Sequence, residues 1–202
     1  MYFLAIYGKI YRYAIKIIIF YIKVVTILNK IMVNSNGLEM KTISVLFTTY
    51  TDFVSRLVGI MSGFNCTHVS IALDEDNEYF YSFNTKGFKK EYPKRHKNRT
   101  KENVCLKVQV TPQQYNKLRG LIERFERKKD KYKYNYWGVF FCMMRLSHER
   151  ENKYFCSEFV AELLAKAKIL TLRKKKSRYL PYHLKKELLL CPLVIGVIQN
   201  IL

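Results

Sequence analysis

Residues Tyr154 to Leu164 read Tyr-Phe-Cys-Ser-Glu-Phe-Val-Ala-Glu-Leu-Leu, which places Cys156 at the start of a predicted amphipathic helix. A thiol in the first helical turn lies near unpaired backbone N–H groups and the positive end of the helix dipole. This environment favours the thiolate, the form of cysteine that attacks carbonyl carbon. The stretch therefore predicts a helix packed on the core and a candidate nucleophile at its first residue.

A candidate base lies far upstream, where His68 opens a predicted strand over 67–73. This strand and a second one over 78–84 flank a turn-rich segment, so the two are expected to form a hairpin. If the numbers of paired residues have an even sum (an even-numbered register), strand alternation places Ser82 or Asn84 on the face that carries His68. A catalytic histidine needs an acceptor on its second ring nitrogen, and either side chain can supply one.

Three segments resemble the permuted papain-like cysteine hydrolases of the NlpC-type peptidase superfamily, in which the histidine precedes the cysteine. They are residues 67–73, residues 155–160, and the aromatic segment 131–135 before the cysteine helix. The resemblance spans residue 41 to about residue 190. It implies that Cys156 is the nucleophile, His68 the base and Ser82 the third residue. Relatives often carry Glu or His at that third position, so a serine there would weaken the base.

The resemblance implies an α+β fold in which a small antiparallel sheet or half-barrel packs on the cysteine helix. It also implies a cysteine-dependent amidase or endopeptidase that cleaves amide bonds of cell-wall peptides. Two alternatives stay open: a lipid-directed thioesterase or acyltransferase, and a basic binding module with a decayed site. None of these functions requires a metal or organic cofactor. A zinc site formed by Cys66, His68 and Cys156 would lack an evident fourth ligand.

The composition is strongly basic, with 36 Lys and Arg residues against 16 Asp and Glu residues and a formal net charge of +20. This excess favours anionic partners, either a lipid surface or an acidic cell-wall polymer. No groove-reading motif or zinc finger is present, so nucleic acid is not an expected partner. The five cysteines form no CxxC pair, which argues against a disulfide scaffold and for reduced thiols.

Residues 1–36 are expected to form a separate apolar and basic helix with its linker, followed by the hydrolase domain over 37–202. Lysines recur every seven residues in this segment, at Lys9, Lys16, Lys23 and Lys30, and give one basic stripe on an apolar helix. Residues 1–33 predict a helix that lies in a membrane interface. A helix packed on another subunit, or translation from Met32 or Met40, are the alternatives. The lysines argue against a spanning helix and a secretory signal, so we expect a membrane-associated or cytoplasmic protein.

The remaining elements follow from local signals. Thr111, Pro112 and Gln114 give a strong helix start, because Thr can cap the helix and Gln can close a capping box. Residues 86–101 are very basic and are expected to form a surface loop. Further strands are predicted at 43–49, 104–110 and 193–201. Helices are predicted at 53–61, 112–128, 136–146 and 156–168. A basic loop at 173–178 precedes a last helix that begins at Pro181.

Overall fold

The computed structural model describes residues 39–50, 66–73, 78–93 and 100–201. The chain divides into two compact units, Met1–Glu39 and Met40–Leu202. The helices predicted at 1–33 and 53–61 lie outside the described residues. The second unit is an α+β domain, as the sequence predicted.

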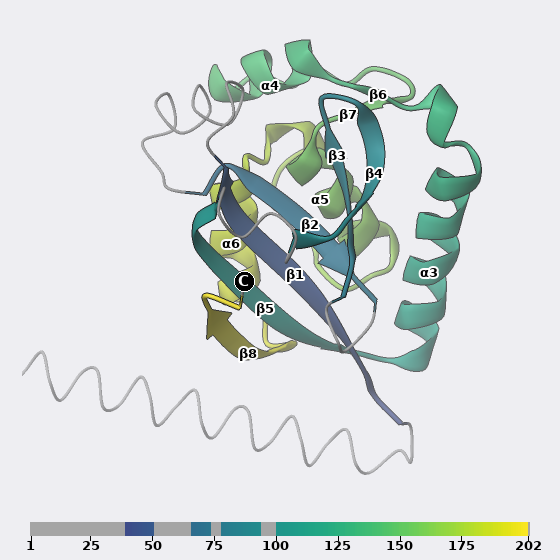
Figure 1. The fold of residues 1–202 in the computed structure, drawn as a ribbon, viewed down its shortest axis with the longest axis vertical. Helices are drawn as coiled ribbons and strands as arrows, with labels where there is room; N and C mark the ends of the chain where they lie inside the picture. The colour runs from purple at the N-terminus through teal and green to yellow at the C-terminus, as the bar shows by residue number, and fades with distance from the viewer. Residues whose placement is uncertain (1–38, 51–65, 74–77, 94–99, 202) are drawn as a thin grey trace, which may run out of the picture. The chain divides into compact units, whose positions relative to one another are not determined.

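The centre of the domain is a six-stranded antiparallel sheet with the strand order β4-β3-β2-β1-β5-β8 (Figure 1). A separate pair of short parallel strands, β6 and β7, lies before the cysteine helix. The six strands of the main sheet are β1 (Lys41–Tyr50), β2 (His68–Ala72), β3 (Phe80–Asn84), β4 (Gly87–Glu91), β5 (Thr100–Val110) and β8 (Val194–Gln199), and the short pair is β6 (Lys133–Tyr134) and β7 (Lys153–Tyr154).

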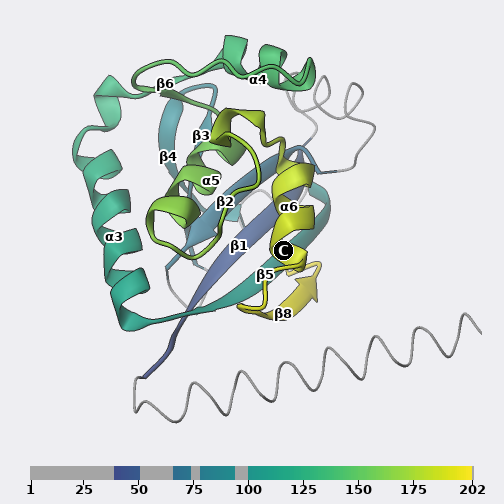
Figure 2. The same ribbon diagram turned by 180° about the vertical axis from the view of Figure 1, so that it is seen from behind.

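One face of the sheet carries α5 and α6, which lie in front of β1, β2 and β5 in Figure 2. The main core forms where apolar residues of the strands meet α5, with Val69 and Ile71 from β2 and Phe159 and Leu163 from the helix. The helices are α3 (Pro112–Arg127), α4 (Tyr136–Met143), α5 (Cys156–Lys166) and α6 (Pro181–Leu189), and two 3-10 turns are η2 (Lys129–Lys131) and η3 (Lys176–Arg178).

The helix that begins at Cys156 is more buried than an amphipathic helix should be. Residues 156 to 164 are all buried, including the two glutamates Glu158 and Glu162. The physical reason is that β2 and β3 cover one side of α5 while α3, α6 and η3 contact the others. The predicted helix start is correct, but the predicted polar face is not exposed to solvent.

The local signals at the start of α3 are confirmed. The hydroxyl of Thr111 accepts a hydrogen bond from the Gln114 N–H at 3.2 Å, and the Gln114 side chain accepts one from the Thr111 N–H at 3.0 Å. This reciprocal pair satisfies two N–H groups that a helix N-terminus otherwise leaves unpaired.

The surface loop predicted at 86–101 is wrong in its first part, because residues 87–91 form strand β4. Asn84 pairs with Gly87 across a two-residue turn, and Gly87 adopts a left-handed φ of 92° that favours glycine. Phe88 is buried against Phe83, Phe125 and Phe159, so one aromatic side chain anchors an otherwise basic strand. Charged residues are common on such edge strands because they discourage pairing with other chains.

Candidate active site

His68 is the first residue of β2, and it is 7% exposed. Strands β2 and β3 pair through Ile71 and Tyr81, which is the even-numbered register that the hairpin prediction required. The hydroxyl oxygen of Ser82 therefore lies on the same face and 3.1 Å from Nε2 of His68. The structure thus brings together His68 and Ser82, the predicted third residue.

A carboxylate that the sequence reasoning missed also contacts His68. Oε2 of Glu91, at the end of β4, lies 3.0 Å from the same Nε2 atom. The Asn84 side chain, the alternative third residue, donates to Oε1 of Glu91 at 3.4 Å and accepts from the Lys86 N–H at 2.9 Å. Asn84 is thus linked to His68 indirectly, through the carboxylate of Glu91.

The polar groups around Nε2 of His68 suit a protonated ring. The Ser82 hydroxyl donates its single hydrogen to the Val69 carbonyl at 3.0 Å, so it faces Nε2 as an acceptor. Glu91 is an acceptor when ionised. A proton on Nε2 lets both groups act as acceptors, as in an imidazolium.

His68 also hydrogen-bonds the side chain of Cys156, the first residue of α5. Burial is the largest influence on the imidazole and lowers its pKa. The charge of Glu91 and the hydrogen bonds with Cys156 and Glu91 outweigh this influence and raise the pKa of His68 well above its usual value. The imidazolium is therefore the favoured form near neutral pH.

The N-terminus of α5 adds a second source of positive potential. Its N-cap residue, Phe155, makes no side-chain capping hydrogen bond to the first turn. N–H groups in such a turn can stabilise an oxyanion that forms on a carbonyl attacked by Cys156. Within the described part of the chain, the buried Ser157 hydroxyl beside Cys156 has no hydrogen-bond partner.

Glu158, in the first turn of α5, ties this helix to the segment before it. Its carboxylate accepts hydrogen bonds from the Phe155 backbone and from the Asn135 side chain. Burial, the largest cause, raises the pKa of Glu158 to about 7, against the lowering effect of Lys176 and these hydrogen bonds. Because Asn135 also caps α4 through the Gly138 N–H, α4 and α5 begin at one shared polar junction.

The other buried thiols lie in less polar surroundings. Burial raises the pKa of both Cys66 and Cys142 to about 12. The Cys66 thiol donates to the His68 carbonyl oxygen at 3.8 Å, so it contacts the backbone of the base. Among the residues that the structure describes, no group of three or more His, Cys, Asp or Glu side chains is arranged to hold a metal ion.

A second ionic cluster lies farther along α5. Glu162 is 5% exposed, and its two carboxylate oxygens accept hydrogen bonds from Lys166 and Lys176. Burial raises the pKa of Glu162, but the hydrogen bonds and charges of the two lysines outweigh it, so the pKa lies below its usual value. The buried carboxylate is thus held in its ionised form.

The sequence contains a signal that could have identified Glu91. Asn84 and Gly87 flank two polar residues, a pattern that favours a tight hairpin turn. Continuing the alternation from Ser82 across such a turn places Lys89 and Glu91 on the face of His68, and the observed pairs Ser82–Lys89 and Phe80–Glu91 have this parity. The high positive charge of the segment concealed this pattern.

A scan against models of protein families and a search of curated proteins each found no match for this chain. In the part of the chain that the structure describes, no helix has both the length and the apolar character needed to cross a membrane.

Proposed function

We propose that the protein is a cysteine-dependent acyl hydrolase with a permuted papain-like site. Cys156 is the nucleophile, His68 the general base, and Glu91 together with Ser82 positions the imidazole. The observation that carries the proposal is the position of His68. It hydrogen-bonds the Cys156 thiol, while its Nε2 atom lies 3.0 Å from Glu91 and 3.1 Å from Ser82.

The reaction follows from these contacts. In the reactive pair, His68 already holds the proton of the Cys156 thiol as an imidazolium, and the thiolate sulfur forms a bond to the substrate carbonyl carbon. The negative charge that develops on the carbonyl oxygen faces the N-terminus of α5. The carbon–nitrogen bond then breaks, and the imidazolium gives its proton to the leaving amine. A water molecule, deprotonated by His68, attacks the thioester and releases the acid and the thiol.

The resemblance to NlpC-type peptidases favours amide bonds of cell-wall peptides as the substrate. The net charge of +20 suits an anionic polymer of this kind. Glu91 also bears on the alternative of a decayed binding module, which rested on a serine as the third residue. A carboxylate on Nε2 stabilises the imidazolium more than a hydroxyl does, so Glu91 supports a catalytic site over a decayed one.

A lipid-directed thioesterase or acyltransferase is the second candidate function. The observation that favours it is an exposed aromatic face on α4, the helix that shares a polar junction with the N-terminus of α5. Both candidates use the same acyl-transfer chemistry and differ in the substrate that reaches Cys156. An amide and a thioester substrate of matched acyl group would separate them.

Site-resolved alkylation of the folded protein across pH tests the proposed dyad. We expect iodoacetamide to modify Cys156 faster than the partly exposed Cys191. This reaction should persist well below the pKa of an ordinary thiol, which is roughly 8.5. Cys66 and Cys142 should react slowly because their pKa values of about 12 keep them protonated.

In the variant His68→Ala, Cys156 should no longer be alkylated faster than Cys191 at low pH. The variant His68→Gln, which keeps more of the packing, should show the same loss. Circular dichroism would verify that both variants fold. If Cys156 reacts no faster than Cys191 in the native protein, or keeps its low-pH reactivity in both variants, the dyad does not exist.

A further inference from the structure

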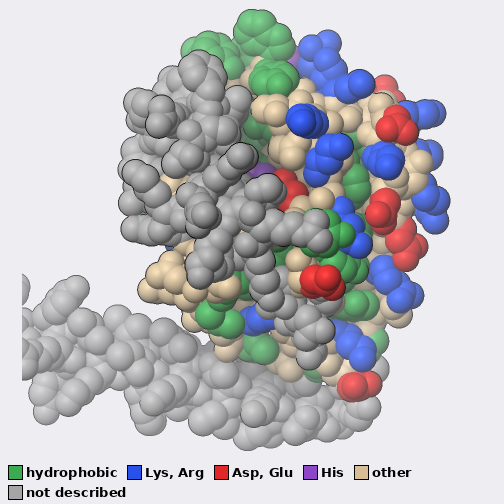
Figure 3. All heavy atoms as spheres, in the orientation of Figure 1, with side chains coloured by type: hydrophobic (Ala, Val, Ile, Leu, Met, Phe, Trp, Pro, Cys, Tyr) green, Lys and Arg blue, Asp and Glu red, His purple; other side chains and the backbone are tan. Residues whose placement is uncertain are grey.

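Helix α4 presents an aromatic face to solvent. Its side chains Tyr136, Trp137, Phe140 and the C-cap Met144 are 54, 59, 42 and 53% exposed. Their spacing places them on one side of the helix. Figure 3 shows hydrophobic side chains gathered at the top of the molecule, where α4 lies in Figure 1. Leu146, just after the helix, extends this apolar surface and is 50% exposed.

The opposite side of α4 is already used by the fold. Val139 and Cys142 are buried in a small cluster with Phe155 and Leu180. The helix reads Tyr-Trp-Gly-Val-Phe-Phe-Cys-Met and has no charged residue. A helix that is apolar on both sides is normally buried on both sides. The exposed outer face of α4 therefore indicates a contact with an apolar medium.

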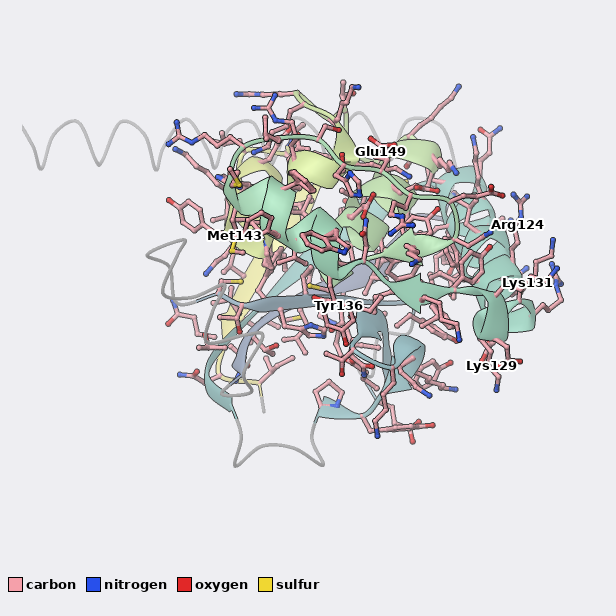
Figure 4. All side chains as sticks on the ribbon, turned by 90° about the horizontal axis from the view of Figure 1, so that it is seen from above. Arg124, Lys129, Lys131, Tyr136, Met143 and Glu149 are labelled. Carbon is pink, nitrogen blue, oxygen red and sulfur yellow. The ribbon has the colours of Figure 1, made fainter. Side chains whose placement is uncertain are left out.

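The side chains and charges around α4 indicate which medium this is. Tyr and Trp beside Lys and Arg are typical of protein surfaces that enter a membrane interface. Lys133 precedes the helix and Arg145 follows it. Arg178 is also near, because its charge lowers the pKa of Cys142 on α4 against the larger effect of burial. In Figure 4, which looks onto this end of the molecule, Tyr136 and Met143 lie along α4, while Arg124, Lys129 and Lys131 gather to one side.

We propose that the outer face of α4, formed by Tyr136, Trp137, Phe140 and Met144, docks onto an anionic lipid surface. The aromatic and thioether side chains enter the interface between headgroups and acyl chains. The cations beside the helix interact with anionic headgroups. This contact is separate from the membrane helix predicted at residues 1–33.

Docking in this way would bring the candidate active site to the lipid surface. Phe155, which precedes Cys156, packs in the same cluster as Val139 of α4. The Tyr136 hydroxyl donates to the Thr85 carbonyl oxygen at 3.4 Å, in the turn next to Asn84, which holds Glu91. This step rests on the proposed acyl-transfer site, and it favours the second candidate function, in which the substrate is an acyl group carried by a lipid.

The single tryptophan of the chain, Trp137, gives a direct test with the full-length protein. Its fluorescence would be measured with vesicles of phosphatidylcholine, with and without phosphatidylglycerol, and with brominated acyl chains as quenchers. We expect a blue shift and quenching with the anionic vesicles, both reduced by high salt because screening weakens the attraction to the headgroups. Cys156→Ala should behave like the native chain, which separates docking from catalysis.

Matched variants extend the test without losing the reporter. Phe140→Ser and Met144→Ser should each weaken vesicle binding by about tenfold, because each removes a large apolar side chain from the interface. Leu190→Ser, at the end of α6, changes a side chain that is 66% exposed outside this face and should leave binding unchanged.

Three results would overturn the proposal. The chain could fail to bind anionic vesicles. It could bind them while Trp137 keeps the emission and quenching of an indole in water, which would assign binding to another segment. A blue shift that appears without lipid and grows with protein concentration would instead show that the face joins two copies of the chain.

Discussion

Two ionic clusters contact helix α5, and they differ in the cation that pairs with each carboxylate. At the start of the helix, Glu91 holds His68 beside Cys156. In its second half, Glu162 holds Lys166 and Lys176. Histidine changes its charge near neutral pH, whereas a lysine ammonium group stays charged to much higher pH.

This difference separates a site that can move protons from one that only stabilises the fold. The carboxylate raises the pKa of His68 but leaves the ring able to exchange a proton with a thiol. The lysines lower the pKa of Glu162 and hold it ionised. A close ion pair is common to both clusters, so the chemical identity of the cation, and the thiol next to it, distinguish the candidate active site.

Glu91→Gln should have the largest effect on chemistry. The amide keeps the shape of the side chain but removes the charge that raises the pKa of His68, so that pKa should fall. The rate at Cys156 should drop by about tenfold to hundredfold, and the high-pH limb of the pH–rate profile should move to lower pH. Hydrolysis rates across pH would measure both changes.

The exposed Glu123, paired with Arg119 on α3, supplies the control, because Glu123→Gln should change neither the rate nor the profile. An unchanged profile in Glu91→Gln would mean that Glu91 plays no part in setting the charge of the imidazole.

Glu162→Gln should instead lower stability and leave the rate per folded molecule unchanged. We expect a loss of about 1–3 kcal/mol in the free energy of unfolding at pH 7, because two lysines lose a buried charged partner. The folded pKa of Glu162 lies below its ordinary value of 4.5. Its contribution is therefore present above pH 4.5 and is lost as the pH falls through the lower, folded pKa.

Urea unfolding at pH 7 and at several acidic pH values would measure this difference between the native chain and the variant. The gap should close in acid. In the control Glu123→Gln, which removes an exposed pair, the loss should stay under about 1 kcal/mol. A gap for Glu162→Gln that does not depend on pH would show that the ion pairs contribute nothing and that only packing was lost.

Ser82→Ala should have the smallest effect, about twofold to fivefold on the rate at Cys156. Glu91 still holds Nε2 in this variant, and the Ser82 hydroxyl contributes one neutral hydrogen bond. The comparison with Glu91→Gln, under the same assay, ranks the two groups. If Ser82→Ala lowers the rate more than Glu91→Gln does, then Ser82, the predicted third residue, is the main group that positions the imidazole.

Much of the framework was predictable because its signals are local. The capping box at Thr111 and Gln114, the helix that begins at Cys156 and the hairpin that pairs Ser82 with the face of His68 each depend on residues close in sequence. The basic segment 86–101 was not predictable from its charge, since the strand there depends on the turn at Gly87 and the burial of Phe88.

By itself, the sequence determined the order of the elements, a thiol at a helix N-terminus and an imidazole at a strand start, because periodicity, capping and turn chemistry act over a few residues. Only the tertiary structure decided which groups meet. The pairing of β2, β3 and β4 brings Glu91 to His68, and the packing of α5 on β2 brings Cys156 to the same ring. The core covers one side of α4 and leaves its aromatic side exposed. These outcomes depend on contacts between residues far apart in the chain, and local patterns do not encode such distances.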